Sequence, residues 1–165
     1  MSMQKAVFLL FVFLTFKLAF CADMKLTSPV FKNNNFIPSE YSCEGQDINP
    51  PLTIEGLPQD TKSLALIVDD PDASMGTWVH WVVYNIEPVD KIEENTVPGA
   101  EAINNSGRFV YHGPCPPSGT HRYFFKVYAL DTKIQDKVKD KADLEKLMKG
   151  HILASAELVG LYKRK

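Results

Sequence analysis

The sequence has little of several features that would reveal a function directly. Basic residues do not outnumber acidic ones: the 165 residues include 18 Lys and Arg against 20 Asp and Glu, a formal net charge of −2. A chain without a basic excess has no general attraction for nucleic acid or for anionic membranes. We therefore expect no nucleic-acid partner, and any charged ligand must be bound by local groups.

Long apolar runs are also scarce. The most extended one, Ala6 to Phe16, lies near the N-terminus and is followed by Lys17. It is shorter than the about 20 apolar residues of a membrane helix but fits the apolar part of a signal peptide, which is about 7–15 residues long. We interpret 1–21 as a signal peptide and 22–165 as a single domain that is periplasmic or secreted after cleavage.

Two alternatives for this leader stay open. The first is a membrane anchor that is not removed, which would need a longer apolar run, because Lys17 interrupts this one after Phe16. A lipoprotein attached at Cys21 would have Leu18 and Ala19 at suitable positions, but Phe20 is too bulky for the position before the cysteine. We expect no stable membrane insertion of the mature domain.

Cysteine is rare as well: the chain has three, Cys21, Cys43 and Cys115. Because Cys21 belongs to the leader region, an exported domain would keep two, and an oxidising compartment favours a disulfide between them. Two free thiols are one alternative. A catalytic Cys115 paired with a histidine is another.

The sequence after the leader favours β-structure, because β-branched and aromatic residues recur in short segments between turn signals. The expected strands are Phe36–Ile37, Leu52–Ile54, Ser63–Val68, Val79–Ile86, Arg108–Tyr111, Tyr123–Leu130 and Ala156–Tyr162. One helix is predicted from Asp140 to Gly150 with Ala142 and three larger apolar residues toward one side, and a short helical turn from Val89 to Glu94. The order of elements is not a βαβ pattern, so we predict a mainly β domain of antiparallel strands.

Three segments place polar side chains at the ends of expected strands. Val68–Ala73 puts aspartates where one strand turns, and Trp78–Trp81 opens the next strand. Period-two alternation predicts that Trp78 and His80 share one face and that Trp81 points to the other. The third segment, "GPCPPSGTHRY" at 113–123, has prolines and glycines that hold a loop rigid and let a ligand approach its backbone.

Antiparallel strands that follow one another can bring these ends to one rim. Two histidines there would donate N–H groups to an anion, and an aspartate would fix their tautomer and charge. Affinity is then expected to rise as the pH falls through the histidine pKa, about 6.5 when unperturbed.

Other chemistry at the same residues is less well supported by the sequence. A zinc site of Asp70, His80 and His121 lacks the short spacing of a metal motif and a fourth ligand. A hydrolase using Ser118 lacks the turn that exposes a nucleophile. A hydrolase of small phosphate or acyl substrates with either histidine as base is the remaining enzymatic alternative.

At these residues the chain resembles the phosphatidylethanolamine-binding protein family, in particular its bacterial Raf-kinase-inhibitor-like branch of YbhB/YbcL type. The resemblance extends over 24–163. The motifs that carry it are "DDPDA", "WVHWVVYNI", "GPCPPSGTHRYFFKVYAL", "CEGQDINPPLTIEGLP" and "HILASAELVGLY".

The resemblance implies a mainly β fold of two antiparallel sheets with one or two short helices, lacking the C-terminal helix of eukaryotic members. It also implies a non-enzymatic pocket for a small anion or a phospholipid head group, with no cofactor and no metal. The ligand-binding residues carried over by motif are Asp70, Trp78, His80, Gly113, Pro114, Pro116, His121 and Tyr123. The supporting residues are Asp72, Pro71 and Pro117.

The chain departs from the family pattern at two places. Ser74 and Met75 follow the "DPDA" motif where proline is frequent, so we expect a looser outer lip of the pocket. Kinase inhibition is not expected to carry over from eukaryotic members, because their C-terminal helix is missing here and the leader predicts export from the cytoplasm. A protein-interaction module that inhibits a kinase, a protease or another signalling partner stays the alternative function.

Overall fold

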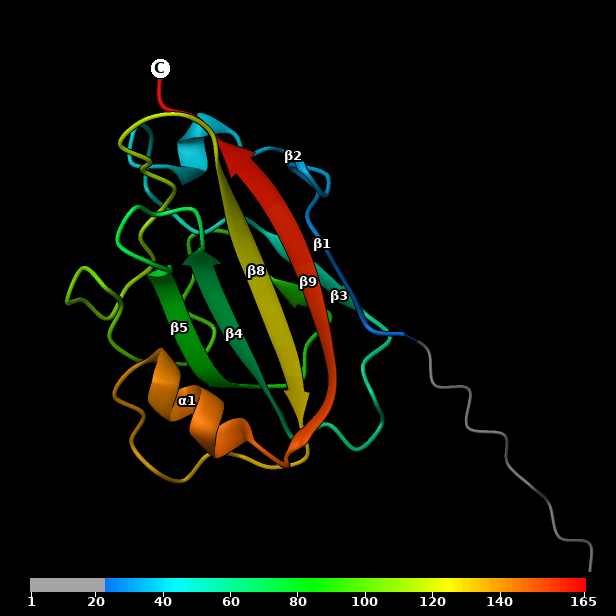
Figure 1. Ribbon diagram of the computed structural model, residues 1–165. Helices are drawn as coiled ribbons and strands as arrows, with labels where there is room; N and C mark the ends of the chain where they lie inside the picture. The colour runs from blue at the N-terminus through cyan, green and yellow to red at the C-terminus, as the bar shows by residue number, and fades with distance from the viewer. Residues whose placement is uncertain (1–22) are drawn as a thin grey trace, which may run out of the picture.

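The computed structural model describes residues 23–165, so the predicted leader, its cleavage site and Cys21 lie outside the described residues. This part of the chain forms two β-sheets, a 3-10 helix η1 (Ser39–Tyr41) and the helix α1 (Lys141–Met148), as Figure 1 shows. Over residues 23–165, no helix is both long enough and apolar enough to span a bilayer.

The large sheet has six strands in the order β2-β9-β8-β4-β5-β7. Their bounds are β2 Asn35–Phe36, β9 Ile152–Tyr162, β8 His121–Leu130, β4 Ser63–Asp70, β5 Trp78–Ile86 and β7 Ala100–Glu101. The small sheet has the order β1-β3-β6, with β1 Lys25–Thr27, β3 Leu52–Glu55 and β6 Lys91–Ile92. The predicted mainly β class is confirmed; among these strands the β2–β9 pair alone is parallel.

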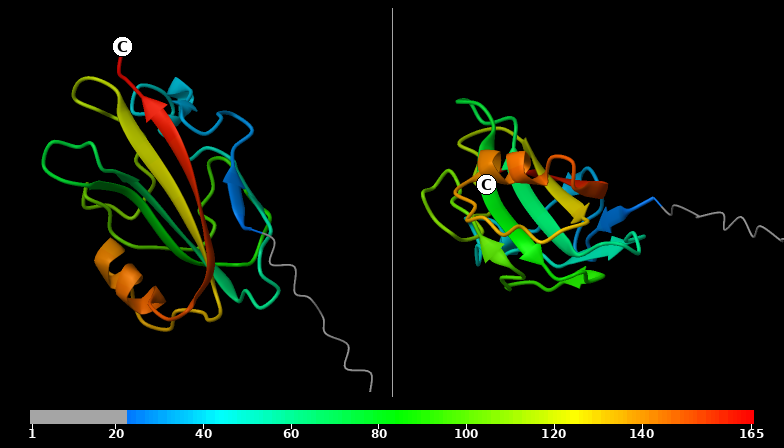
Figure 2. Two further views of the ribbon diagram at one scale, coloured as in Figure 1. Left: turned by 45° about the vertical axis from the view of Figure 1, so that its right-hand side comes forward. Right: turned by 90° about the horizontal axis from the view of Figure 1, so that it is seen from below.

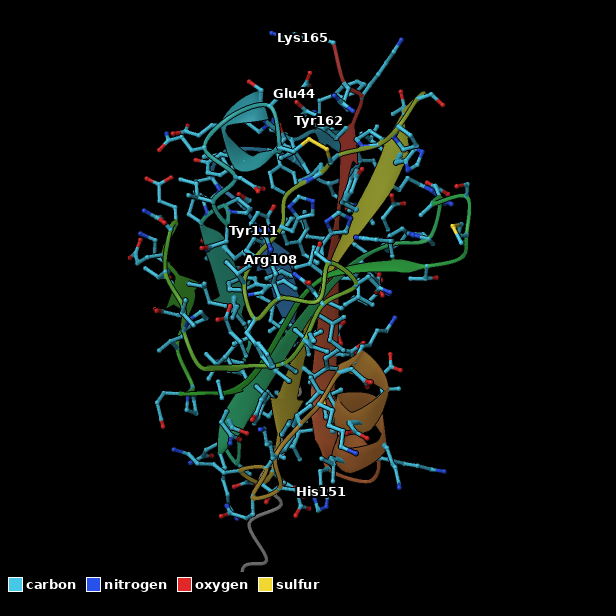
Figure 3. The ribbon with its side chains drawn as sticks, turned by 90° about the vertical axis from the view of Figure 1, so that its left-hand side faces the viewer. Glu44, Arg108, Tyr111, His151, Tyr162 and Lys165 are labelled. Carbon is cyan, nitrogen blue, oxygen red and sulfur yellow. A yellow bond between two sulfur atoms is a disulfide. The ribbon has the colours of Figure 1, made fainter. Side chains whose placement is uncertain are left out.

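The large sheet is covered on both faces, which is why all eight residues of β4 are buried. Leu64, Leu66 and Val68 point into a core shared with the small sheet. Ala65 and Ile67 point the other way, into a core closed by α1. Figures 2 and 3 show α1 and the small sheet on opposite sides of the long strands.

Helix α1 begins and ends close to the predicted limits. The Asp140 carboxylate caps it by accepting the Asp143 backbone N–H at 3.0 Å. Leu144 and Met148 are buried against the sheet. Ala142, predicted on the buried side, is exposed because it lies on the solvent face of the first turn.

Two predicted elements are wrong. Residues 108–111 do not form a strand because their backbone bonds to Asn104 instead: its amide donates to the Val110 carbonyl at 2.8 Å and its oxygen accepts the Arg108 N–H at 3.1 Å. Residues 89–94 do not form a helical turn because β6 pairs with β3, and this pairing buries Ile92 in the core.

The two aspartates that end β4 separate to opposite faces of the sheet. Asp69 lies on the α1 side with its side chain 1% exposed, and it accepts hydrogen bonds from Lys126 Nζ at 2.8 Å and Lys141 Nζ at 2.5 Å. This cluster ties α1 to the middle of the sheet. Asp70 is therefore the only one of the pair available to the site described below.

Replacing Asp69 tests the role of this cluster. We expect Asp69→Asn to lower the free energy of unfolding by about 2–3 kcal/mol, somewhat less than for a fully buried pair because both lysines can turn toward water. Urea unfolding measures the difference. Glu87→Gln, which removes the exposed partner of Lys133, is the control and should change stability by about 0–1 kcal/mol. Equal effects of the two substitutions would contradict the buried cluster.

Candidate functional site

A cavity of about 300 Å³ opens at the end of the large sheet where β4 ends and where β5 and β8 begin. Because β4 runs antiparallel to both neighbours, these three strand ends meet at one edge. The cavity is lined by Asp70, Ala73, Ser74, Met75, Trp78, His80, His112, Cys115, Pro116, Pro117, His121 and Tyr123. Neither lysine nor arginine is among these residues.

Most of the predicted ligand-binding residues come together here, but two do not. Gly113 lies outside the cavity and donates its N–H to Asp47 Oδ1 at 2.6 Å. A Cβ at Gly113 would lie 2.3 Å from the Tyr41 carbonyl oxygen, so only glycine fits. Pro114 also lies outside, and its carbonyl accepts the Cys43 N–H at 3.2 Å. Both residues attach the loop to the neighbouring chain segment instead of lining the cavity.

The predicted supporting residues hold the turn after β4. The Asp72 carboxylate binds the Arg122 guanidinium through two hydrogen bonds, at 2.6 and 2.9 Å, which lowers the pKa of Asp72 to about 2. The Asp72 N–H donates to Asp70 Oδ1 at 2.8 Å, so the turn holds the Asp70 carboxylate. Pro71 is exposed outside the cavity, whereas Pro117 is part of its rim.

Asp70 and His121 form a nearly buried pair across the ends of β4 and β8. His121 Nδ1–H donates to Asp70 Oδ2 at 2.7 Å, and the side chains of His121 and Asp70 are 11% and 5% exposed. Both Asp70 oxygens are thus engaged, one by His121 and one by the turn. The pair fixes the orientation of the imidazole and leaves its Nε2 toward the cavity.

A β-bulge aims His80 into the site. Val68 pairs with Trp81 and Asp69 pairs with Val79, so His80 is the extra residue of β5. The bulge turns Trp81 to the same face as His80, where it packs in the small-sheet core. The predicted alternation, which put Trp81 on the opposite face, is wrong for this reason.

His80 is held as a neutral ring. Its Nδ1 lies 2.6 Å from the His112 carbonyl oxygen, and the His112 N–H donates back to the His80 carbonyl at 3.2 Å. Since a carbonyl only accepts, Nδ1 carries the proton. Burial lowers the pKa of His80 to about 4, so at neutral pH its Nε2 is a lone-pair acceptor. The N–H donor toward an anion expected from His80 is therefore not present.

Tyr123 supplies a hydrogen-bond donor, whereas His80 supplies an acceptor. Its side chain is 1% exposed, and its hydroxyl has no hydrogen-bond partner among residues 23–165. Burial and the nearby Asp70 charge raise the pKa of Tyr123; the Cys115 backbone N–H opposes this shift, although it makes no well-directed hydrogen bond. A buried hydroxyl without a partner is unusual in native proteins and marks a place for a ligand or a water.

One wall of the cavity is cross-linked. Cys43 and Cys115 form a disulfide with Cα atoms 5.5 Å apart, and Cys115 lines the cavity. Figure 3 shows the disulfide beside Glu44 and Tyr162 at one end of the molecule. The Tyr162 hydroxyl donates to Glu44 at 2.7 Å, so the end of β9 also supports this wall.

The outer rim is apolar and open. Met75 is 96% exposed and Trp78 is 37% exposed, and both lie beside the cavity. Sequence reasoning did not include His112, whose ring stacks on His80 with centroids 5.8 Å apart and whose Nδ1 lies 3.2 Å from Asp47. Its position next to the rigid loop was the available signal, but only the bulge in β5 brings it against His80.

The alternative chemistries find little support in this geometry. Within residues 23–165, no group of three or more His, Cys, Asp or Glu side chains is placed to hold a metal ion. Ser118 is exposed on the loop and does not line the cavity. Cys115 is in the disulfide and is not available as a thiol nucleophile.

The neutral His80 predicts a pH dependence of stability. Between pH 6.5 and about 4 the unfolded chain binds a proton at this residue that the folded protein does not, so the stabilisation is complete above pH 6.5 and is lost as the pH falls. We expect a loss of about 3 kcal/mol over this window. Urea unfolding at pH 7 and pH 4.5 measures it. His80→Asn, which keeps a donor for the His112 carbonyl, should show a smaller loss; an equal loss would place the titrating group elsewhere.

The disulfide predicts a second stability effect. The two cysteines are 72 residues apart, and closing a loop of that length stabilises by about 4 kcal/mol in the chain-entropy description. Replacing both Cys43 and Cys115 by Ser should lower the free energy of unfolding by a similar amount. Mass spectrometry of the unreduced protein should find no free thiol on either residue, and two free thiols would contradict the pairing.

Comparison with known proteins agrees with this fold. A family model described as phosphatidylethanolamine-binding protein matches residues 27–163. A UPF0098 protein of Pyrococcus horikoshii is 53% identical over 150 residues, covering 84% of this chain and 76% of the relative. A UPF0098 protein of Methanothermobacter thermautotrophicus is 47% identical over 150 residues, covering 86% of this chain and 99% of the relative.

Two solved structures share the architecture. A phosphatidylethanolamine-binding protein homolog from Chlamydia trachomatis superimposes with a TM-score of 0.84 at 42% identity, over 87% of this chain and 99% of that one. YbcL from Escherichia coli, described as a member of the mammalian family, superimposes with a TM-score of 0.79 at 32% identity, over 87% of this chain and 100% of that one. The chain belongs to the phosphatidylethanolamine-binding protein family.

Proposed function

We propose that the protein binds a small anion or a phosphorylated head group in the cavity between β4, β5 and β8, without chemical turnover. The observation that carries this proposal is the unpartnered hydroxyl of Tyr123, a buried donor beside the Asp70–His121 pair. An oxygen of a phosphoryl group would accept from it. The names of the family and of the related structures, which refer to phosphatidylethanolamine binding, support the same class of ligand.

The apolar rim adds a second part to this ligand. Met75 and Trp78 lie outside the polar floor, where they would contact the substituent of a phosphoryl group. The same exposed side chains favour the alternative function, a protein-interaction module whose partner seats an apolar residue on the rim. Phosphate competition against such a partner would separate the two. Export of the protein after cleavage of 1–21 stays part of the proposal.

Tyr123→Phe tests the proposed function sharply, because it removes one oxygen and little else. Without ligand, the variant should be as stable as the parent or more stable by about 1 kcal/mol, since an unpaired buried hydroxyl is lost. Its affinity for inorganic phosphate or phosphoethanolamine should fall by about tenfold, the size of a hydrogen bond to a charged group. Thermal unfolding and calorimetric titration give the two numbers.

The matched control is Tyr128→Phe, a tyrosine of the same strand that points to the α1 side and does not line the cavity. It should leave phosphate affinity unchanged. Equal phosphate affinity in Tyr123→Phe and the parent would show that this hydroxyl does not contact the anion and would remove the main support for the site.

A further inference from the structure

The buried polar groups of the cavity include a hydrogen-bond acceptor as well as a donor. His80 Nδ1–H is used by the His112 carbonyl, and His121 Nδ1–H is used by Asp70. The neutral His80 ring therefore presents its Nε2 lone pair, and within the described residues the Nε2 atoms of His80 and His121 make no hydrogen bond. Tyr123 contributes one donor. A fully deprotonated anion, which only accepts, would match the hydroxyls of Tyr123 and of Ser74 at the rim and would oppose His80 Nε2 and the Asp70 carboxylate.

The charged groups around His80 also disfavour a fully deprotonated anion. On β4, the Asp70 carboxylate lies at the cavity floor. On β8, Tyr123 meets the His80 ring edge-on at 5.2 Å, and beyond the bulge His112 stacks on it with its Nδ1 near Asp47. Arg108 lines a neighbouring cavity with Asp47 and His112, and Arg122 is paired with Asp72. No fixed positive charge therefore lines the first cavity to balance a dianion.

We propose that this cavity selects anions that carry an acidic O–H group, and that His80 Nε2 accepts a hydrogen bond from that group. The inference rests on the proposed function and narrows its ligand class. Inorganic phosphate keeps an O–H group throughout the neutral range, and a phosphomonoester, whose last pKa is about 6, keeps one below that pH. Sulfate and phosphodiesters do not. A phosphomonoester end, free or at the head of a lipid, is thus preferred over the diester of an ordinary phospholipid head group.

The buried position of His80 strengthens the selection. Placing a second proton on its ring would bury a charge, and burial already lowers its pKa to about 4. The ring therefore stays an acceptor at neutral pH, and a ligand without a proton leaves the Nε2 unpaired in contact with an anion. Loss of a hydrogen bond to a charged group changes affinity by about 10- to 100-fold.

The test is a calorimetric panel on the unmodified protein at pH 6, where inorganic phosphate and about half of a phosphomonoester carry an O–H group and His80 is neutral. Inorganic phosphate and phosphoethanolamine should bind about tenfold or more tightly than sulfate and glycerophosphoethanolamine, because only the first two carry an acidic O–H. A short-chain phosphatidic acid in the panel separates a lipid source of the monoester from a free one. Equal affinity for phosphate and sulfate, or for the monoester and the diester, would overturn the inference.

The pH profile separates a proton on the ligand from a proton on a histidine. Phosphoethanolamine affinity should fall as the pH rises from 6 to 8, because its phosphate group loses its last proton over this range. Sulfate, which does not titrate there, should stay weak throughout. Parallel tightening of sulfate and phosphate on acidification would mean that histidine protonation drives binding, and this result would also overturn the inference.

Two variants assign the effect to His80. His80→Asn keeps the donor to the His112 carbonyl but has no Nε2, so the phosphate-to-sulfate affinity ratio should shrink to within a few-fold. Arg108→Gln is the control: it removes a nearby charge and should weaken both anions alike, leaving the ratio unchanged. An unchanged ratio in His80→Asn would overturn the assignment.

The same measurements distinguish failure of this inference from failure of the proposed function. Phosphate that binds and depends on Tyr123, but with no preference over sulfate, overturns the inference alone. No binding of any anion, with or without binding of ethanolamine itself, overturns both.

Discussion

The central position of β4 is the constraint on which the site depends. This strand pairs with β5 on one side and β8 on the other, antiparallel in both cases. Its last residue therefore lies against the first residues of both neighbours, and Asp70 comes beside His121 without any long loop having to fold over the site. The hydrogen bonds of the sheet fix these backbone positions, so little ordering is left for ligand binding.

Both faces of β4 are buried, and this determines how its acidic end is used. Alternation sends Asp69 to the α1 side, where two lysines neutralise it, and Asp70 to the cavity, where none does. Two adjacent aspartates thus have separate tasks. One attaches the helix to the sheet, and the other orients an imidazole.

Much of this arrangement could be predicted from the sequence, because strand-forming segments and the polar residues at their ends are local signals. The strands that carry Asp70, His121 and Tyr123 were expected almost at their observed limits. Features that depend on contacts distant in sequence could not be predicted in this way. The bulge at His80 arises from the register between β4 and β5, and Asn104 removes the expected strand at 108–111 by binding its backbone.

The balance of hydrogen-bond donors and acceptors in the cavity also depends on contacts distant in sequence. This balance determines which anions the cavity can bind. A histidine in a sequence suggests a donor for an anion, yet the carbonyl of His112 takes that donor from His80 and leaves an acceptor. The buried Tyr123 hydroxyl without a partner costs stability in the free protein, and a ligand that pairs with it recovers that cost. Because this selection depends on hydrogen-bond polarity and not on a cluster of positive charges, it acts at short range and is little screened by salt.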